Sequence, residues 1–136
     1  MAKEYKIIAE LLQRGDSKTF GEARLEVYSE HLDKIEKLSI TENIKNYYDS
    51  LLPEVIKRYN LIKYQKTRET EEEKITRQER LAKTRLRLEA ILEAGVAQKD
   101  QLERLKENPA QLESFYTKIF KPEINRIYHM RLARCN

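Results

Sequence analysis

Glycine and proline are scarce in this sequence, with three of each among 136 residues, and tryptophan is absent. Glycine and proline supply most of the tight turns between β-strands, so their scarcity argues against a sheet protein. Charged residues, in contrast, make up 37% of the chain, and most of them are Glu, Lys and Arg, which favour helix. The composition therefore predicts an all-α fold.

The same scarcities leave little material for a catalytic, metal or cofactor site. Glycine occurs only at positions 15, 21 and 95, so the chain holds no phosphate-binding loop and no dinucleotide-binding fingerprint. One cysteine, Cys135, and two distant histidines, His31 and His129, cannot form a His/Cys zinc site with the usual spacing. No Glu-x-x-His pair of the kind that builds a di-iron centre occurs either. We expect no enzymatic activity, no metal, no cofactor and no small-molecule substrate.

Long apolar runs are also missing. No run approaches the ~20 residues that a membrane-spanning helix needs. The first residues (MAKEYKIIAELLQRGD) have no signal-peptide core and carry acidic side chains early, which argues against a cleaved presequence. A single cysteine excludes an intramolecular disulfide and fits a reducing compartment. We expect an intracellular protein of the cytoplasm or an organelle matrix, without a membrane span.

The longest stretch without a helix breaker runs from Pro53 to Gly95. A proline in the first turn and a glycine after the last turn are typical of helix ends, so this stretch predicts one long central helix over about 53–94. Its middle, residues 65–74 (QKTRETEEEK), has no apolar side chain. This charged waist leaves two interpretations open. The stretch is an exposed helical rod between two packed ends, or two helices joined by a mobile charged linker.

Shorter helices are predicted on both sides of this stretch. Apolar residues recur at helical spacing in residues 1–52, which predicts N-terminal helices. Pro53 would clash with the preceding helical turn, so we expect a kink or a tight corner there. In residues 96–136, Asn108-Pro109 is a strong helix start, and a further helix follows Pro122. We predict a single domain over residues 1–136, an elongated, coiled-coil-like helical bundle.

Basic residues are concentrated in the second part of the chain. Residues 1–52 hold 8 Lys/Arg and 10 Asp/Glu, a net −2, whereas residues 53–136 hold 19 and 13, a net +6. Residues 57–68 contain five basic residues, two tyrosines and no acid, and residues 126–134 contain three arginines and no acid. Basic side chains neutralise phosphates and tyrosines stack on bases, so both stretches suit a nucleic acid. A solvated basic face, or a patch for an acidic protein, explains them too. The candidate contacts with a polyanion or a protein partner are Lys57, Arg58, Lys63, Tyr64, Lys66, Arg68, Arg77, Arg85, Arg126, Arg131 and Arg134.

An apolar stripe in the last third of the long stretch offers a second kind of contact. A 136-residue monomer has a small core, and an apolar stripe left uncovered marks a partner surface. The candidate helix-partner stripe consists of Leu81, Leu88, Ile91 and Leu92.

Two functions follow from these surfaces. We expect a non-catalytic structural or adaptor subunit of a larger intracellular macromolecular assembly, hetero- or homo-oligomeric, that works through protein–protein contacts. The alternative is a basic helical nucleic-acid-binding protein, a ribonucleoprotein subunit or a nucleocapsid-type coat. It would grip phosphates through residues 57–68 and the C-terminal arginines.

Overall fold

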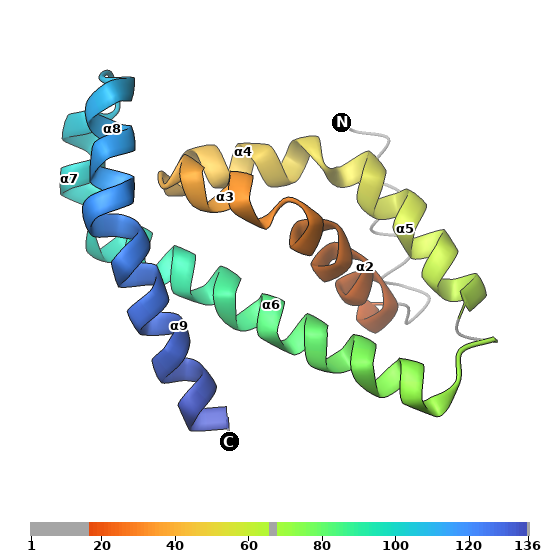
Figure 1. The fold of residues 1–136 in the computed structure, drawn as a ribbon. Helices are drawn as coiled ribbons and strands as arrows, with labels where there is room; N and C mark the ends of the chain where they lie inside the picture. The colour runs from red at the N-terminus through yellow and green to blue at the C-terminus, as the bar shows by residue number, and fades with distance from the viewer. Residues whose placement is uncertain (1–16, 66–67, 136) are drawn as a thin grey trace.

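The computed structural model describes residues 17–65 and 68–135, which contain helices and no strand. The predicted all-α fold is therefore confirmed (Figure 1). The predicted helix in residues 1–16 and the candidate contact Lys66 lie outside the described residues. The elements are α2 (Ser17–Glu30), α3 (Leu32–Leu38), α4 (Thr41–Ser50), α5 (Leu52–Gln65), α6 (Glu71–Ala97), α7 (Lys99–Leu105), α8 (Pro109–Phe115), the π-helix η1 (Tyr116–Phe120) and α9 (Lys121–Cys135).

The long central helix exists, but the extent predicted for it, 53–94, is wrong. It is α6, with 27 residues, and it begins only at Glu71. The Thr70 side chain caps its start by accepting a hydrogen bond from the Glu73 amide at 3.1 Å. Three glutamates in the first turn add a favourable interaction with the helix dipole. The charged waist is therefore divided, since residues 68–70 are not helical and residues 71–74 form the first turn of α6.

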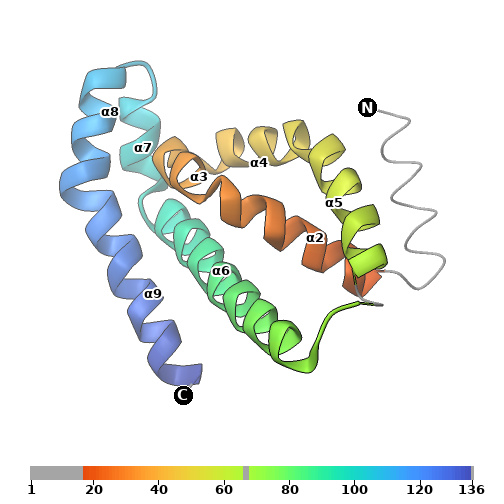
Figure 2. The same ribbon diagram turned by 45° about the vertical axis from the view of Figure 1, so that its right-hand side comes forward.

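The chain reverses direction between α5 and α6. Both helices lie along α2 and run antiparallel to each other (Figures 1 and 2), and α2 packs most extensively against α5. One hydrophobic cluster connects these helices with α9 and η1. The two apolar ends of the predicted rod thus share one core. An unbroken helix would have kept these two ends far apart. Among the largest fully buried side chains are Val27, Ile35, Ile44, Val55, Ile91, Phe120 and Ile124.

Two prolines affect the path of the helices in different ways. At Pro53 the predicted corner is present, since α4 ends at Ser50, Leu51 lies between the helices and α5 begins at Leu52. At Pro122 the helix continues instead of stopping. The Lys121 amide donates to the Tyr116 carbonyl, which makes the wider turn of a π-helix before Pro122. This wider turn accommodates a residue that has no amide hydrogen.

The C-terminal helices form an arm that packs against α6. Figures 1 and 2 show α9 leading back from the C-terminal end of α6 and packing against it, with α7 and α8 side by side beyond that end. α8 starts where sequence predicted a helix start, because the Asn108 side chain accepts a hydrogen bond from the Gln111 amide at 3.2 Å and Pro109 follows. Within the described part of the chain, no helix combines the length and the apolar character that a bilayer crossing requires.

Candidate partner interface

Several basic side chains that sequence proposed as contacts bind acidic residues of this chain. Arg58, on α5, donates to Glu26 at 3.3 Å and lies 2.6 Å from a carboxylate oxygen of Glu30, both on α2. Arg80, on α6, donates to the same Glu26 carboxylate. These pairs fasten α2 to its two neighbours. The positive charge of Arg58 is therefore largely matched inside the molecule.

Arg77 is the most enclosed of the candidate cations. Only 9% of it is exposed, and its guanidinium makes a two-point contact with Glu69 at 2.8 and 3.1 Å and a third contact with Glu22 at 3.0 Å. The hydrogen bonds that Arg77 donates to Glu69 raise the pKa of Arg77 above its usual range. Glu69 lies in the turn before α6 and Glu22 lies on α2. Arg77 therefore holds the reversal of the chain against α2 and presents little charge to solvent.

Two of the three C-terminal arginines, Arg126 and Arg131, are also paired with glutamates. Arg126 pairs with Glu123 on its own helix, and Arg131 donates to Glu89 at 2.9 Å and to Glu93 at 2.6 Å across the α6–α9 contact. The hydrogen bond that Arg131 donates to Glu93 raises the pKa of the Arg131 guanidinium. Arg134 is exposed near the end of α9.

The basic stretch over 57–68 divides between the inside and the outside of α5. Tyr59 and Ile62 are buried, and the ammonium of Lys63 lies 5.8 Å from the centre of the Tyr59 ring. Lys57 and Tyr64 face solvent, and the Arg68 guanidinium lies 4.6 Å from the centre of the Tyr64 ring. Of the two tyrosines in this stretch, Tyr59 belongs to the core and Tyr64 does not. Arg85 is exposed on α6 and does not belong to this stretch.

The apolar stripe of α6 is mostly used inside the chain. Leu81, Leu88 and Ile91 are buried, whereas Leu92 is 37% exposed. One turn further along, Val96 is 68% exposed. Near the start of α6, Ile75 is 51% exposed, and the rest of the apolar surface that α6 leaves open lies at its C-terminal end, beyond the centre of the predicted stripe.

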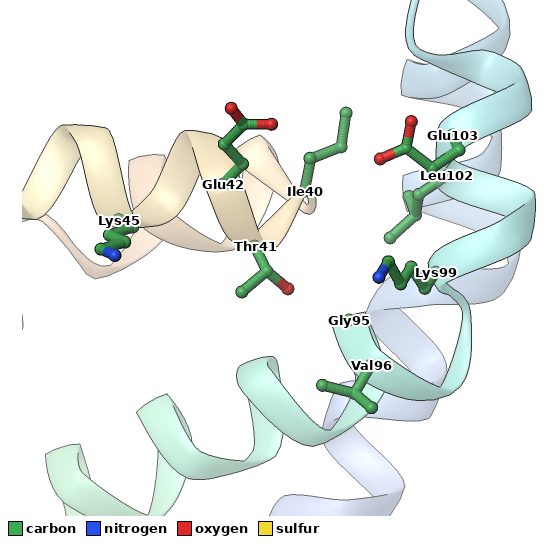
Figure 3. A pocket seen from close by; sticks show the side chains of 9 residues that line it. All are labelled: Ile40, Thr41, Glu42, Lys45, Gly95, Val96, Lys99, Leu102 and Glu103. Carbon is green, nitrogen blue, oxygen red and sulfur yellow. The ribbon is translucent and has the colours of Figure 1, made fainter.

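Val96 stands at the edge of a pocket of about 510 Å³ between the start of α4, the end of α6 and α7 (Figure 3). Apolar side chains form much of its wall, and four charged side chains surround it. We call this surface the α6–α7 groove. Its lining residues are Ile40, Thr41, Glu42, Lys45, Gly95, Val96, Lys99, Leu102 and Glu103.

Gly95 sets how closely α6 and α4 approach. Sequence predicted it as a helix stop, but it lies inside α6 and is buried. A Cβ atom at this position would lie 3.1 Å from Thr41 Oγ1 and 3.3 Å from the Ser39 carbonyl oxygen. Ser39 reaches this position with a positive φ of 63°. The groove therefore depends on a backbone contact that only glycine permits without displacement.

A buried polar cluster, which sequence did not indicate, joins α3 to the C-terminal arm. Glu36 is 4% exposed, accepts a hydrogen bond from the Tyr116 hydroxyl at 3.0 Å and pairs with Arg87. Arg87 also donates to the Asn125 side chain at 2.7 Å and lies over the Tyr128 ring. Burial, with Glu36 beside it, raises the pKa of Tyr116 above its usual range. Because its carboxylate and guanidinium are matched, the cluster is suited to fixing helices in place.

No group of three or more His, Cys, Asp or Glu side chains in residues 17–65 and 68–135 is placed to hold a metal ion. Comparisons of the chain with protein families, with curated proteins and with solved structures found no significant match.

Proposed function

We propose that this chain is a non-catalytic structural or adaptor subunit of a larger macromolecular assembly, and that it binds a protein partner at the α6–α7 groove. The observation that carries the proposal is Val96, 68% exposed at the edge of a largely apolar pocket of about 510 Å³. Burying a valine or leucine side chain fully is worth about 1.5–3 kcal/mol. A partner that covers Val96 gains this free energy, whereas without a partner Val96 stays exposed to solvent. Exposed apolar surface next to a pocket is typical of a protein interface.

The charge arrangement supports a protein partner over a polyanion. Arg58, Arg77, Arg126 and Arg131 each bind glutamates of this chain. A phosphate would have to compete with these carboxylates, and the competition removes part of the gain from releasing counterions. A groove with apolar walls and charged side chains around it has the composition expected of a protein interface, which combines an apolar centre with a polar rim.

The decisive experiment purifies the tagged full chain from its native source, treats it with nuclease, and identifies the proteins that remain bound. Val96→Asp places a charge at the edge of the groove, and we expect it to lose the bound proteins. Leu61→Asp is the matched control, because Leu61 is 55% exposed on α5, on a different element from the groove. Circular dichroism checks that both variants keep their helix content. The proposal fails if Val96→Asp retains every protein, or if nuclease alone releases them all.

The nucleic-acid alternative stays a prediction, and Tyr64 is the observation in its favour. This tyrosine is 59% exposed, with Arg68 against its ring, an arrangement on which a base can stack. Changing Lys63, Lys66 and Arg68 to Glu should then weaken binding to single-stranded RNA and flatten its dependence on salt. Unchanged binding to every polyanion would remove this alternative.

A further inference from the structure

Two hollows follow each other along the seam between α2 and α6. Their volumes are about 320 and 250 Å³, and both are lined by Gly21, Leu25 and Arg85, so they form one continuous depression. The helices α2 and α6 lie side by side and run in the same direction (Figures 1 and 2). We call this depression the α2–α6 groove. It shares no lining residue with the α6–α7 groove.

The α2–α6 groove has the length of a short helix. Its lining on α6 extends from Gln78 to Leu92, which corresponds to ~21 Å at ~1.5 Å per residue. On α2 the lining extends from Lys18 to Tyr28, or ~15 Å. A helix of about 10–14 residues therefore matches the groove in length, and amphipathic helices bind other proteins in grooves of this kind.

Leucine side chains from both helices form the apolar part of the groove. Leu81 and Leu88 are buried, Leu25 is half-buried, and Leu92 is 37% exposed at the far end. Contact with water at these side chains is unfavourable, and apolar side chains of a partner would remove it. The partner that fits the groove therefore has an apolar face.

The charged side chains beside these leucines are mainly basic and have no acidic partner. Lys18, Arg24 and Arg85 are exposed, and none of them forms an ion pair with another described residue. The lining contains one acid, Glu22, and its carboxylate accepts a hydrogen bond from Arg77 at 3.0 Å. The groove thus carries a positive charge that this chain does not match. Acidic side chains along the edges of a partner would complement it.

Gly21 lies in the second turn of α2, at the point where the two hollows meet. Glycine is among the least favourable residues inside a helix. A Cβ atom at this position would meet nothing within 4 Å, so the packing of this chain does not require a glycine. A partner that approaches the α2 backbone closely would require it, because a larger side chain would extend into the groove.

We infer that the α2–α6 groove binds an amphipathic helix of a partner protein, with apolar side chains on one face and Asp or Glu along its edges. This adds a second docking surface to the chain, and it does not depend on the α6–α7 groove. The leucines favour a protein over a nucleic acid, because they gain from apolar contacts that a phosphate backbone does not make.

Selection from a library of helical peptides on the pure, full-length chain tests the inference. Each peptide has about 14 residues, with leucine at positions i, i+4, i+7 and i+11 and every other position randomised over Asp, Glu, Lys, Arg, Ala and Gln. We expect the bound peptides to contain several-fold more acidic than basic residues. Their affinity should fall as the salt concentration rises, because exposed charges are screened.

A substitution at Gly21 locates the peptide on the chain. Gly21→Leu places a side chain where the hollows meet and should weaken binding of the best selected peptide by about tenfold or more, measured by fluorescence anisotropy. The open space around Gly21 lets this variant keep its fold, which circular dichroism and urea denaturation check. Leu61→Asp and Val96→Asp are the matched controls. Neither residue lines the groove, so both variants should bind the peptide as the unchanged chain does.

Charge reversal tests the complementarity and leaves the leucines in place. The Arg24→Glu/Arg85→Glu double variant should weaken binding of the acidic peptide by about tenfold or more, because both changes place like charges together. The same variant should bind a second peptide, in which Lys replaces every Asp and Glu, more tightly than the unchanged chain does. Both arginines are exposed, so their replacement leaves the core intact.

The inference is wrong if no peptide binds, if the bound peptides have no acidic excess, or if either Gly21→Leu or the charge reversal leaves binding unchanged. A single-stranded RNA that binds the unchanged chain but not Gly21→Leu, in the absence of peptide binding, would assign the groove to a nucleic acid. Release of the native assembly by Val96→Asp without any peptide binding would reject this inference alone. Peptide binding as expected, with an assembly that Val96→Asp leaves intact, would reject only the proposed function of the α6–α7 groove.

Discussion

At the scale of single residues, this molecule uses charge mainly to fasten its own helices. Arg77 and Glu36 are both nearly buried, and each is held by partners that come from other parts of the chain. Burying a charge is costly unless it is paired and hydrogen-bonded, so removing one partner costs more than the pair contributes. The two sites are therefore sensitive to substitution in a way that exposed ion pairs are not.

Replacing Arg77 by Met should lower the free energy of unfolding by about 3 kcal/mol, because the carboxylates of Glu22 and Glu69 would lose their shared cation. Urea denaturation followed by circular dichroism measures the change. Arg126→Met is the matched control, since its pair with Glu123 lies exposed on one helix, and we expect no measurable effect. Equal effects of the two substitutions would contradict the role assigned to Arg77.

Alkaline pH should destabilise the fold through its tyrosines. Burial raises the pKa of Tyr48, whose ring stacks on Tyr28 at 4.2 Å, to about 12 from the ordinary value of 10.0. Between these two values the unfolded chain loses the Tyr48 proton and the folded chain keeps it, so stability falls as pH rises. Below pH 10 the contribution is fully present.

Tyr48→Phe should therefore make the loss of stability between about pH 10 and 12 shallower. Urea midpoints measured across this range give the slope. Tyr64→Phe, which removes a tyrosine hydroxyl at an exposed position, serves as the control. An identical slope in Tyr48→Phe and in the unchanged chain would show that Tyr48 does not contribute.

At the scale of the element, the contact between α6 and α4 depends on the missing side chain of Gly95. Gly95→Val should lower the free energy of unfolding by about 2 kcal/mol, because its side chain meets the Ser39 carbonyl and Thr41. Gly21→Ala is the control, since a Cβ there meets nothing within 4 Å inside α2. Replacing a helical glycine by alanine at such a site should stabilise the fold by up to about 1 kcal/mol. Thermal denaturation compares the two, and the same sign of shift in both would contradict this account.

The sequence predicts the helices and several of their ends better than it predicts the surfaces. The helical composition, the corner at Pro53 and the Asn108-Pro109 start follow from local rules and are present. The sequence does not decide between a continuous helix and a break before α6, because good helix formers fill residues 65–74. The contacts that oppose a continuous helix are tertiary. They are the Arg77 contacts with Glu69 and with Glu22, the latter 55 positions away along the chain.

The candidate surfaces were harder to predict for the same reason. A basic side chain looks free in a sequence whenever its acidic partner is distant, as Glu26 is from Arg58 at 32 positions. The exposed Val96 could be placed at the end of an apolar stripe, but the pocket beside it could not. That pocket is made by α4, α6 and α7 together, and no local pattern contains all three.

At the scale of the whole molecule, a body formed by α2 to α6 meets an arm formed by α7 to α9. The arm is held by the contact between α6 and α9, and by the cluster around Glu36 that reaches α3, α6, η1 and α9. The α6–α7 groove lies where the body and the arm meet. Any partner that fills it therefore touches both parts and holds their relative orientation.

The π-helix η1 makes the length of the arm and its proline interdependent. The wide turn adds one residue to the spacing between Phe115 and Phe120, yet both rings stay in the core. Deleting one residue here would restore ordinary helical spacing and keep the buried face, but Pro122 would then clash with the turn before it. Replacing Pro122 alone would allow an ordinary helix but would rotate Ile124 and Ile127 away from the core. Pro122 therefore ties the arm to the length that the wide turn gives it, because a one-residue deletion before this proline also requires its replacement.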